Sequence, residues 1–553
     1  MTIEKKLLGT SPSGGATDVA DVFSTDLYDG SSSSQTINNG IDLAGEGGMV
    51  WQKLRVHPTP PDGQDHYLRD TVRGGGHRLY SNKTNAESGD DGGMSPNSNG
   101  FSIGSGTAGS LNGAKYVSWT FRKKKKFFDI VTYTGNGVAG REIPHGLGGP
   151  VGMMTIKQRN GTTGWATWHK GANSGNAYLE LNEPDAQNTN GRFFWGNNTS
   201  YIAPTSTEFT VATDTVVNDN GQTYVAYLFA DNSSEDAEDQ MIKCGSYTGN
   251  GSATGPVVNL GWEPQFLITK VVNSNNWNMW DSMRGITAGS DDARLYPNLT
   301  NAEDKSEKLQ LTSTGFQIKS SSASINTSGV ETIYMAIRAP MMVKPEAATD
   351  VFSVQVANNN SAPDITTGFP VDMGIYAQRS KGAIDDTIVV DRIRGGFKRL
   401  VTNKSDTEAT GSSSQAFEFD HSNKVVNNHL TVNSSSVHWL WKRAKGYMDC
   451  VAYSGNATAG RTVAHSLGVV PEMIWVRTRS SAELFAVYHT SEGATKYALF
   501  NTTAFDSFAG AWNNTAPTTT EFSVGNWGKV NANNVTYIAV SYTHLTLPTI
   551  YSV

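Results

Sequence analysis

Two stretches of this chain spell nearly the same sequence: DIVTYTGNGVAGREIPHGLG at 129–148 and DCVAYSGNATAGRTVAHSLG at 449–468. A looser copy, CGSYTGNGSATGPVVNLG, lies between them at 244–261. Their Tyr-x-Gly-Asn core indicates a turn, because Gly and Asn tolerate positive φ. Related copies recur roughly every hundred residues, which is the size of a self-sufficient domain rather than of a solenoid unit that needs its neighbours. The repeat therefore predicts a string of similar domains.

Two further landmarks recur with this turn. One is an Asn at the end of a short strand, usually in Leu-x-x-Asn, where it typically caps its own backbone in an Asx turn. The other is a closing strand, such as YVSWTFR at 116–122 or TYVAYLFA at 223–230, whose aromatic and β-branched residues are typical of a sheet. The copies of the Asn are Asn82, Asn182, Asn298, Asn403 and Asn501.

The fold class predicted from these copies is all-β. No copy shows a helical period, and each consists of short runs separated by Gly, Asn, Ser or Pro, which indicates tandem antiparallel β-sandwiches of a jelly-roll or lectin-like type. Short polar joints predict that the sandwiches line up as a semi-stiff rod. The expected divisions are a flexible segment at 1–17, sandwiches at 18–122, 127–232, 240–339, 347–444 and 446–539, the last of about five copies being incomplete, and an unrelated tail at 540–553.

The copies are of two kinds. The first, third and fourth contain Asp-x-x-Arg-Gly, with Arg73, Arg284 and Arg394, whereas the second and fifth have an aromatic residue followed by His169 or His489. The first and fourth copies also align over DTVRGGGHRLYSNK and DRIRGGFKRLVTNK. A set of three copies therefore restarts near residue 350.

The composition excludes several functions. Charged residues make up only 17% and the net charge is −7, so no broad basic surface for nucleic acid is expected. No apolar run reaches the roughly 18 residues of a membrane helix, so membrane insertion is not expected, and the N-terminus lacks the apolar core of a signal peptide. Cys244 and Cys450 occupy the same strand position in two copies, which predicts two separate buried thiols.

The tail departs from the repeat in the middle of a closing strand. After TYIA at 536–539 the chain reads VSYTHLTLPTIYSV, and its first ten residues resemble the translation of a transposon end used in sequencing-library adapters. This resemblance predicts that the last fourteen residues are an artefact, that the fifth copy lacks its final strand, and that the natural protein is longer.

Most of 18–539 resembles repeat proteins encoded by marine tailed phages. The resemblance lies in VFSTDLYDGSSSSQTINNGIDLAGEGGMVWQK at 22–53, in the TYTGNG stretch and in TYVAYLFA. It implies lectin-type (concanavalin-like) sandwiches with a virion structural or tail-fibre role, assembled in the host cytoplasm alongside other virion proteins. By analogy with fibres it also implies a homotrimer, although no coiled-coil heptad supports one.

No catalytic residue is predicted, and we do not expect an enzyme. Glycoside hydrolysis needs two carboxylates that face one cleft, and no such pair recurs at equivalent positions. The motifs HExxH, CxxC and the P-loop are all absent from the sequence. No cofactor is expected beyond Ca²⁺, which lectin-like sandwiches sometimes hold through Asp and carbonyl oxygens; Asp90, Asp91, Asp291 and Asp292 are the candidate donors.

The candidate ligand-binding residues are Arg73, Arg284, Arg394, His169 and His489. The guanidiniums could meet sugar hydroxyls or acidic glycans at a loop, or each could pair with its own Asp beside a tight turn. The aromatic residues before these His, Trp168 and Tyr488, could stack on a sugar, but their strand position favours a place in the core.

These observations predict a non-enzymatic virion appendage whose sandwiches act as spacers and bind a host cell-surface glycan through weak sites in series. One alternative is capsid decoration or a tail spacer that has no ligand. A polysaccharide depolymerase is the third hypothesis.

Overall fold

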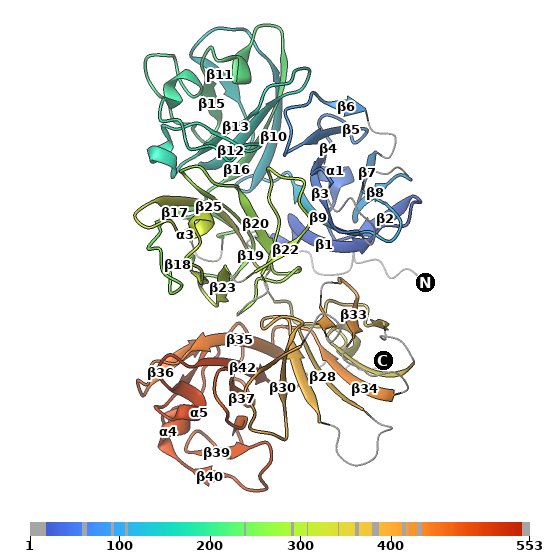
Figure 1. Cartoon of the computed structure of the whole chain (residues 1–553), viewed down its shortest axis with the longest axis vertical. Helices are drawn as coiled ribbons and strands as arrows, with labels where there is room; N and C mark the ends of the chain where they lie inside the picture. Colours follow the sequence, from blue (N-terminus) through green and yellow to red (C-terminus); the bar gives the residue numbers. More distant parts are fainter. Residues whose placement is uncertain are drawn as a thin grey trace, which may run out of the picture.

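The computed structural model is all-β and antiparallel, and it divides into five β-sandwiches (Figure 1). We number them 1 to 5 in chain order, following the predicted ranges. The structure describes residues 18–57, 64–89, 93–105, 109–236, 239–288, 292–306, 308–340, 342–359, 364–378, 386–411, 416–419, 421–428 and 434–544.

Each sandwich has one large sheet in which the closing strand lies between the first strand and a long third strand. In spatial order, the large sheet of sandwich 1 contains β1 (Phe23–Asp29), β9 (Lys115–Arg122), β3 (Gly48–Val56), β4 (Tyr67–Asp70), β5 (His77–Tyr80) and β6 (Ser88–Gly89), and that of sandwich 2 contains β10 (Phe128–Thr134), β16 (Thr223–Ala230), β12 (Val151–Gln158), β13 (Trp165–His169) and β14 (Leu179–Glu180). The large sheet of sandwich 3 contains β17 (Ile242–Thr248), β25 (Glu331–Arg338), β19 (Pro264–Val271) and β20 (Asn278–Asp281). That of sandwich 4 contains β26 (Phe352–Asn359), β34 (Ser434–Trp441), β28 (Met373–Gln378), β29 (Ile388–Asp391), β30 (Lys398–Val401) and β31 (Ala409–Thr410), and that of sandwich 5 contains β35 (Met448–Ser454), β42 (Thr536–Tyr542), β37 (Met473–Thr478), β38 (Ala486–His489), β39 (Lys496–Leu499) and β40 (Asp506–Ser507).

A small sheet covers one face of each large sheet, and the helices among the described residues are single turns. The small sheets are β2 (Gln35–Asn38), β8 (Gly100–Ile103) and β7 (Met94–Asn97); β11 (Arg141–Pro144) and β15 (Glu208–Val211); β18 (Val257–Asn259), β24 (Gly315–Ile318) and β23 (Leu309–Thr312), with the pair β21 (Ala293–Arg294) and β22 (Asp304–Lys305); β27 (Asp364–Thr366), β33 (Lys424–Asn427) and β32 (Phe417–Glu418); and β36 (Arg461–Ala464) and β41 (Glu521–Val524). The α-helices are α1 (Leu43–Glu46), α2 (Thr215–Asn218), α3 (Ala323–Asn326), α4 (Ala509–Trp512) and α5 (Gly528–Asn531), and the 3₁₀ turns are Val19–Asp21, Ala172–Gly175, Gly191–Phe193 and Ala348–Asp350.

The Tyr-x-Gly-Asn turn is fixed by contacts with the helix that precedes the closing strand. In sandwich 2 the Tyr133 hydroxyl donates to the carbonyl of Val217 in α2 (2.6 Å). A Cβ on Gly135 would lie 2.0 Å from the Asp219 carbonyl oxygen, so only glycine fits there. The same hydroxyl-to-carbonyl bond recurs in sandwiches 3 and 5, which explains why the motif recurs.

The prediction that the recurring Asn caps its own backbone is wrong. The Asn side chain caps a neighbouring strand instead. The Oδ1 atom of Asn182 accepts a hydrogen bond from the backbone N–H of Trp165 (2.7 Å), 17 positions earlier in the chain. Asn82 and Asn298 make the equivalent bonds in sandwiches 1 and 3. The Asn therefore holds the start of one strand against the end of the next.

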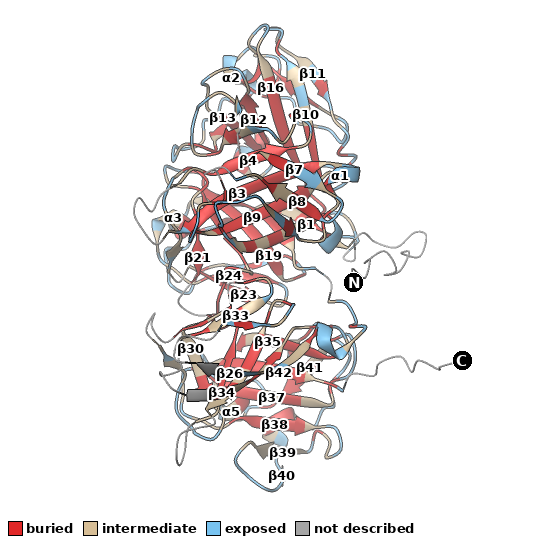
Figure 2. Cartoon of the chain, turned by 90° about the vertical axis from the view of Figure 1, so that its right-hand side faces the viewer, coloured by how far each residue is buried: buried red, intermediate tan, exposed pale blue. Residues whose placement is uncertain are grey.

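Sandwiches 1, 2 and 3 share one apolar core instead of standing apart. Each large sheet turns one face to its own small sheet and the other face to its neighbours, so β12 and β19 are buried along their whole length (Figure 2). The rings of Phe121, Phe229 and Phe266, one from each sandwich, meet at centroid distances of 5.5 and 6.0 Å from Phe121. The expected rod is therefore wrong for this part: the three sandwiches form a closed group, which we call the first ring.

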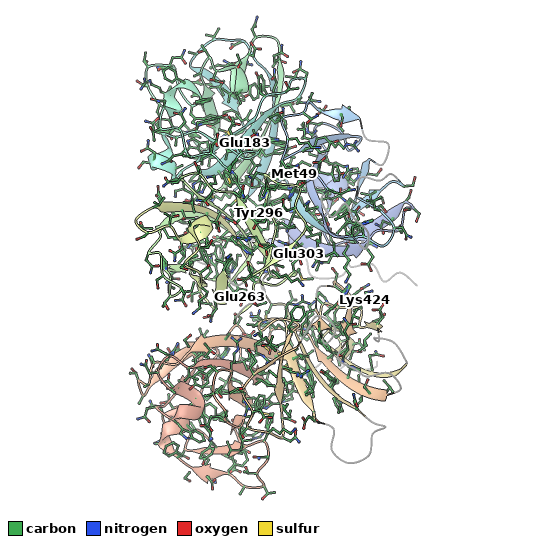
Figure 3. The ribbon with its side chains drawn as sticks, in the orientation of Figure 1. Met49, Glu183, Glu263, Tyr296, Glu303 and Lys424 are labelled. Atoms are coloured by element: carbon green, nitrogen blue, oxygen red, sulfur yellow. The ribbon has the colours of Figure 1, made fainter. Side chains whose placement is uncertain are left out.

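Sandwiches 4 and 5 pack together in a similar way and lie against the first ring. Arg443 of sandwich 4 forms two hydrogen bonds with the carboxylate of Glu263 in sandwich 3 (2.9 and 3.0 Å). Lys424 lies 3.6 Å from a carboxylate oxygen of Asp29 in sandwich 1. Figure 3 labels Glu263 and Lys424 at this boundary.

The closing strand of sandwich 5 is present, which corrects the prediction that it would be missing. β42 continues through the adapter-like residues to Tyr542 and pairs with β35 and β37 over its length. Val540 and Ser541 are buried, because the alternation of VSY fits the two faces of the sheet.

Candidate functional site

The Asp-x-x-Arg turn forms the same closed set of hydrogen bonds in all three of its copies. In sandwich 3 the Nε atom of Arg284 donates to Asp281 (2.6 Å), Nη1 lies 3.5 Å from Glu303, and Nη2 donates to the carbonyl of Met279 (3.3 Å). The Arg284 side chain has no exposed surface. The copies at Arg73 and Arg394 are equally enclosed, so the three guanidiniums offer no surface to a sugar.

The Asp of this turn also binds the closing strand of a neighbouring sandwich. Asp70 accepts a hydrogen bond from the hydroxyl of Tyr227 in sandwich 2 (2.7 Å), and Asp281 accepts one from the indole N–H of Trp119 in sandwich 1 (2.9 Å). Tyr227 and Trp119 occupy equivalent positions in their closing strands. Each lies two residues before the Phe, Phe229 or Phe121, that pairs with the first residue of the first strand. The turn therefore joins sandwich 1 to 2 and sandwich 3 to 1.

His169 takes the place of the Asp at the remaining junction of the first ring. Its Nε2 atom lies 3.0 Å from the carbonyl oxygen of Tyr334 in sandwich 3, and its Nδ1 atom accepts a hydrogen bond from Gly171 N–H (3.0 Å). Burial lowers the pKa of His169 to about 4, so the ring is neutral and Nε2 is the donor. The three junctions 1–2, 2–3 and 3–1 thus close a ring.

A second contact recurs at the outer edge of each junction. The backbone N–H of Glu87 donates to the carbonyl of Arg159 (2.6 Å), and their side chains pair in a bidentate arrangement at 3.0 and 2.8 Å. Glu303 pairs in this way with Arg55, and Glu408 with Arg479, at the 3–1 and 4–5 junctions. At the 2–3 junction Gln187 makes the backbone bond, to the carbonyl of Val272 (2.7 Å), and no side-chain pair accompanies it among the described residues. Figure 3 labels Glu303.

Sequence reasoning did not identify these carboxylates, although a signal was present. Each acidic residue of the pairs stands five positions after the recurring Asn, as Glu87 follows Asn82. The acidic residue could have been found by aligning the copies, but its partner on the next sandwich could not.

The remaining sequence predictions have mixed outcomes. Trp168 and Tyr488 lie in the core, and the two thiols are free and buried, as predicted. His489 is half-buried, and its Nδ1 atom lies 2.7 Å from the Ser491 hydroxyl, so a role in ligand binding stays a prediction. 

The predicted Ca²⁺ donors are of two sorts. Asp90, Asp91 and Asp291 lie outside the described residues. Both carboxylate oxygens of Asp292 accept backbone N–H groups, from Thr287, Lys308 and Leu309 at 2.6–2.8 Å, which indicates a structural cap. Within the part of the chain that is described, no group of three His, Cys, Asp or Glu residues could hold a metal ion.

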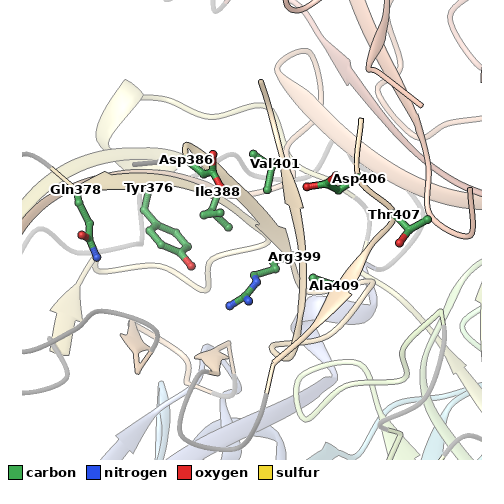
Figure 4. A pocket seen from close by; sticks show the side chains of 9 residues that line it. All are labelled: Tyr376, Gln378, Asp386, Ile388, Arg399, Val401, Asp406, Thr407 and Ala409. Carbon is green, nitrogen blue, oxygen red and sulfur yellow. The ribbon is translucent and has the colours of Figure 1, made fainter. Parts of the chain in front are cut away.

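A hollow of about 290 Å³ opens on the large sheet of sandwich 4 (Figure 4). Tyr376 and Arg399 point toward each other there, and Gln378 and Asp386 also line the hollow. The buried atoms Gln378 Oε1, Asp386 Oδ1 and Arg399 Nη1 have no hydrogen-bond partner among the described residues. In sandwich 1 the equivalent Arg78 lies over the rings of Tyr67 and Tyr80 (5.8 and 5.6 Å), which fill this place. The hollow is therefore a local feature of sandwich 4.

The fold and the junctions define a class of protein in which β-sandwiches pack into multi-domain rings. The model of the family described as domain of unknown function (DUF7483) matches residues 18–340 and 348–546, so the chain belongs to this family. The first match contains three sandwiches and the second contains two. No curated protein sequence matches the chain. Among the helices of the described residues, none has the length and apolar character needed to cross a membrane.

Proposed function

We propose that this chain is a non-enzymatic structural protein of a tailed-phage virion, in which rings of β-sandwiches form a stiff spacer in an appendage. The observation that supports a structural role is that the recurring polar residues are used in the junctions between sandwiches. Buried pairs such as Glu303 with Arg55 fix the geometry of a joint, and their side chains are 1% and 2% exposed. The virion assignment rests on the resemblance of the repeats to those of marine phages.

An enzymatic role has weaker support. Burial raises the pKa of Asp26 to about 6, which is typical of a general acid. This carboxylate accepts a hydrogen bond from Ser422 of sandwich 4 (3.2 Å) at a contact between sandwiches, and it does not line the hollow. A depolymerase would predict that the purified chain lowers the viscosity of host polysaccharide, and we expect no such change.

The virion assignment can be tested with antibodies raised against the purified chain. Immuno-electron microscopy of tailed phages concentrated from seawater is expected to label tails. Labelled capsids would favour capsid decoration, and failure to label any particle type would contradict the proposal.

A second candidate function, glycan binding, is favoured by the hollow in sandwich 4. Arg, Asp and Gln side chains that each have one atom without a hydrogen-bond partner among the described residues, beside an aromatic ring, suit sugar hydroxyls, which need several polar partners and an apolar face. The volume is close to that of the smallest ligand pockets, so a short acidic or neutral oligosaccharide is the expected size of ligand.

A glycan array followed by calorimetry on the best ligand tests this function. We expect Arg399→Met to weaken binding about tenfold, because a hydrogen bond from a charged group is lost. Arg78→Met, at the equivalent position in sandwich 1, is the matched control and should leave the affinity unchanged. Binding that is equally strong in both variants, or absent altogether, would exclude the hollow as a glycan site.

A further inference from the structure

We propose that sandwiches 4 and 5 bind a further sandwich of the kind found at 240–339, which completes a second ring. The binding surface, called the open face, contains Val354, Val356 and Trp439 of sandwich 4 and His489 of sandwich 5. The inferred occupant carries an Asp-x-x-Arg turn and follows sandwich 5 in the same polypeptide, as sandwich 3 follows sandwich 2. The proposal rests on the open face itself, compared with the equivalent face of the first ring.

The open face is the equivalent of a surface that sandwich 3 covers in the first ring. β26 pairs with β34 as β1 pairs with β9, with Phe352 opposite Trp441 where Phe23 is opposite Phe121. Val354 and Val356 therefore match Thr25 and Leu27 of sandwich 1. Thr25 and Leu27 are 7% and 6% exposed, whereas Val354 and Val356 are 49% and 50% exposed. Two exposed valines on one strand face are an apolar surface that lacks its cover.

Polar groups at the open face also lack the partners that their equivalents have. Trp439 stands where Trp119 stands in sandwich 1, and Trp119 donates its indole N–H to Asp281 of sandwich 3. Trp439 is half-buried, and no hydrogen bond from its indole is found within the described part of the chain. His489 matches His169, which bonds the closing strand of sandwich 3, but among the described residues the His489 ring forms hydrogen bonds only with Ser491. 

The burial pattern of the closing strands agrees with a missing neighbour. β9 is buried at six consecutive positions, 116–121, because the sheet is covered on both faces. Over the equivalent positions 436–441, β34 alternates between buried and half-buried residues, as a sheet covered on one face does.

A second copy of this chain is a poorer occupant. The sandwich in each copy that could close the ring is sandwich 3, and its Asp281 and Glu303 are already paired with Trp119 and Arg55 of sandwich 1. Freeing it would open the first ring and take the sandwich 1 donors away from two buried carboxylates, which is destabilising. Covalent connection also raises the effective concentration of a neighbour to about mM.

The test uses the full chain with a second copy of residues 231–340 joined after Tyr542. Hydroxyl-radical footprinting then compares the oxidation rate of Trp439 with and without the added sandwich. We expect an approximately tenfold slower rate in the fusion, because the tethered sandwich excludes solvent from the open face. The matched control carries Trp439→Phe, which removes the indole N–H but keeps an aromatic ring, and its thermal transition should fall below that of the unmodified fusion.

Two results would overturn the proposal. One is a fusion whose added sandwich is folded, as shown by slow hydrogen exchange in its strands, while Trp439 is oxidised as fast as in the parent chain. The other is a parent chain that dimerises in light-scattering measurements with Trp439 protected, because the open face would then be an interface between copies.

Discussion

Removal of one hydroxyl group, by Tyr227→Phe, tests whether the junctions hold the first ring together. The Tyr227 hydroxyl is buried and donates to Oδ2 of Asp70, which also accepts a bond from Arg73. A hydrogen bond to a charged group contributes about 1.5–3 kcal/mol. Because Oδ2 keeps Arg73 as a donor, we expect the lower half of this range, about 1.5–2 kcal/mol of lost unfolding free energy.

The assay is urea unfolding followed by tryptophan fluorescence, with linear extrapolation to water. Trp165 reports on the junction directly, since its ring stacks against Tyr227 at 6.3 Å. One apolar cluster contains side chains of sandwiches 1, 2 and 3, so these sandwiches should unfold together, and Tyr227→Phe should shift that shared transition.

Tyr224→Phe is the matched control. Tyr224 is buried in the same strand, but its hydroxyl donates to the carbonyl of Thr215 (2.7 Å) and accepts from the N–H of Asp219 (2.8 Å), both within sandwich 2. Loss of these two neutral bonds should cost about 1–2 kcal/mol and leave the junction intact. A Tyr227→Phe variant whose stability is unchanged, or that unfolds sandwich 1 in a separate transition, would refute the account of the ring as one cooperative unit.

Three further predictions concern other junctions. Val540→Tyr places a hydroxyl where Tyr227 has one, but Val540 is only 5% exposed and packed in a core cluster, so the larger ring should lower the stability by about 1–3 kcal/mol in the same urea assay; a gain in stability would show that the 4–5 junction has room for the bond that Tyr227 makes. His169 has a pKa of about 4 in the folded chain and about 6.5 when unfolded, so stability should fall by roughly 3 kcal/mol as the pH drops from 6.5 to 4. In His169→Gln, which keeps a donor to Tyr334, this part of the pH dependence should vanish, and an unchanged slope would contradict the assignment. Glu303→Ala should cost about 3–5 kcal/mol, because it removes a carboxylate that is paired with the buried Arg55, and calorimetric unfolding without a shift would exclude a structural role for the pair.

The sequence predicted what is local and repeated. The all-β class, the turn at Tyr-x-Gly-Asn, the core positions of Trp168 and Tyr488, and the separate thiols all depend on contacts within one copy, so a pattern of residues along the chain is enough to indicate them. The prediction for the recurring Asn was wrong because an Asx turn and a cap on a neighbouring strand both need an Asn at the end of a strand. The sequence pattern alone therefore does not distinguish these two roles.

The ring could not be predicted in this way, although one signal of it was present. TYVAYLFA at 223–230 is apolar or small at nearly every position, and β16 is buried at seven consecutive residues, on both faces of the sheet. A strand that is covered on both faces needs a second layer, but the sequence does not identify that layer. Short joints between the sandwiches are compatible with a rod as well as with a ring. The contacts of Asp70 with Tyr227 and of Asp281 with Trp119 distinguish the ring from the rod.

The two kinds of copy have a physical explanation in the order of sandwiches around the ring. In the first ring, the two sandwiches that carry Asp face closing strands with a side-chain donor, Tyr227 or Trp119. Asp391 of sandwich 4 differs, because Val540 stands at the equivalent position of the closing strand that it faces. The closing strand of sandwich 3 has Met335 at that position, which has no donor, and it faces His169, which bonds the backbone instead. An Asp placed opposite Met335 would be a buried carboxylate that lacks this donor, at a cost of several kcal/mol. The alternation of Asp and His therefore favours one order of sandwiches around the first ring and penalises the others. The Asp-x-x-Arg turn and His169, which resemble ligand-binding residues along the sequence, instead specify how the copies assemble.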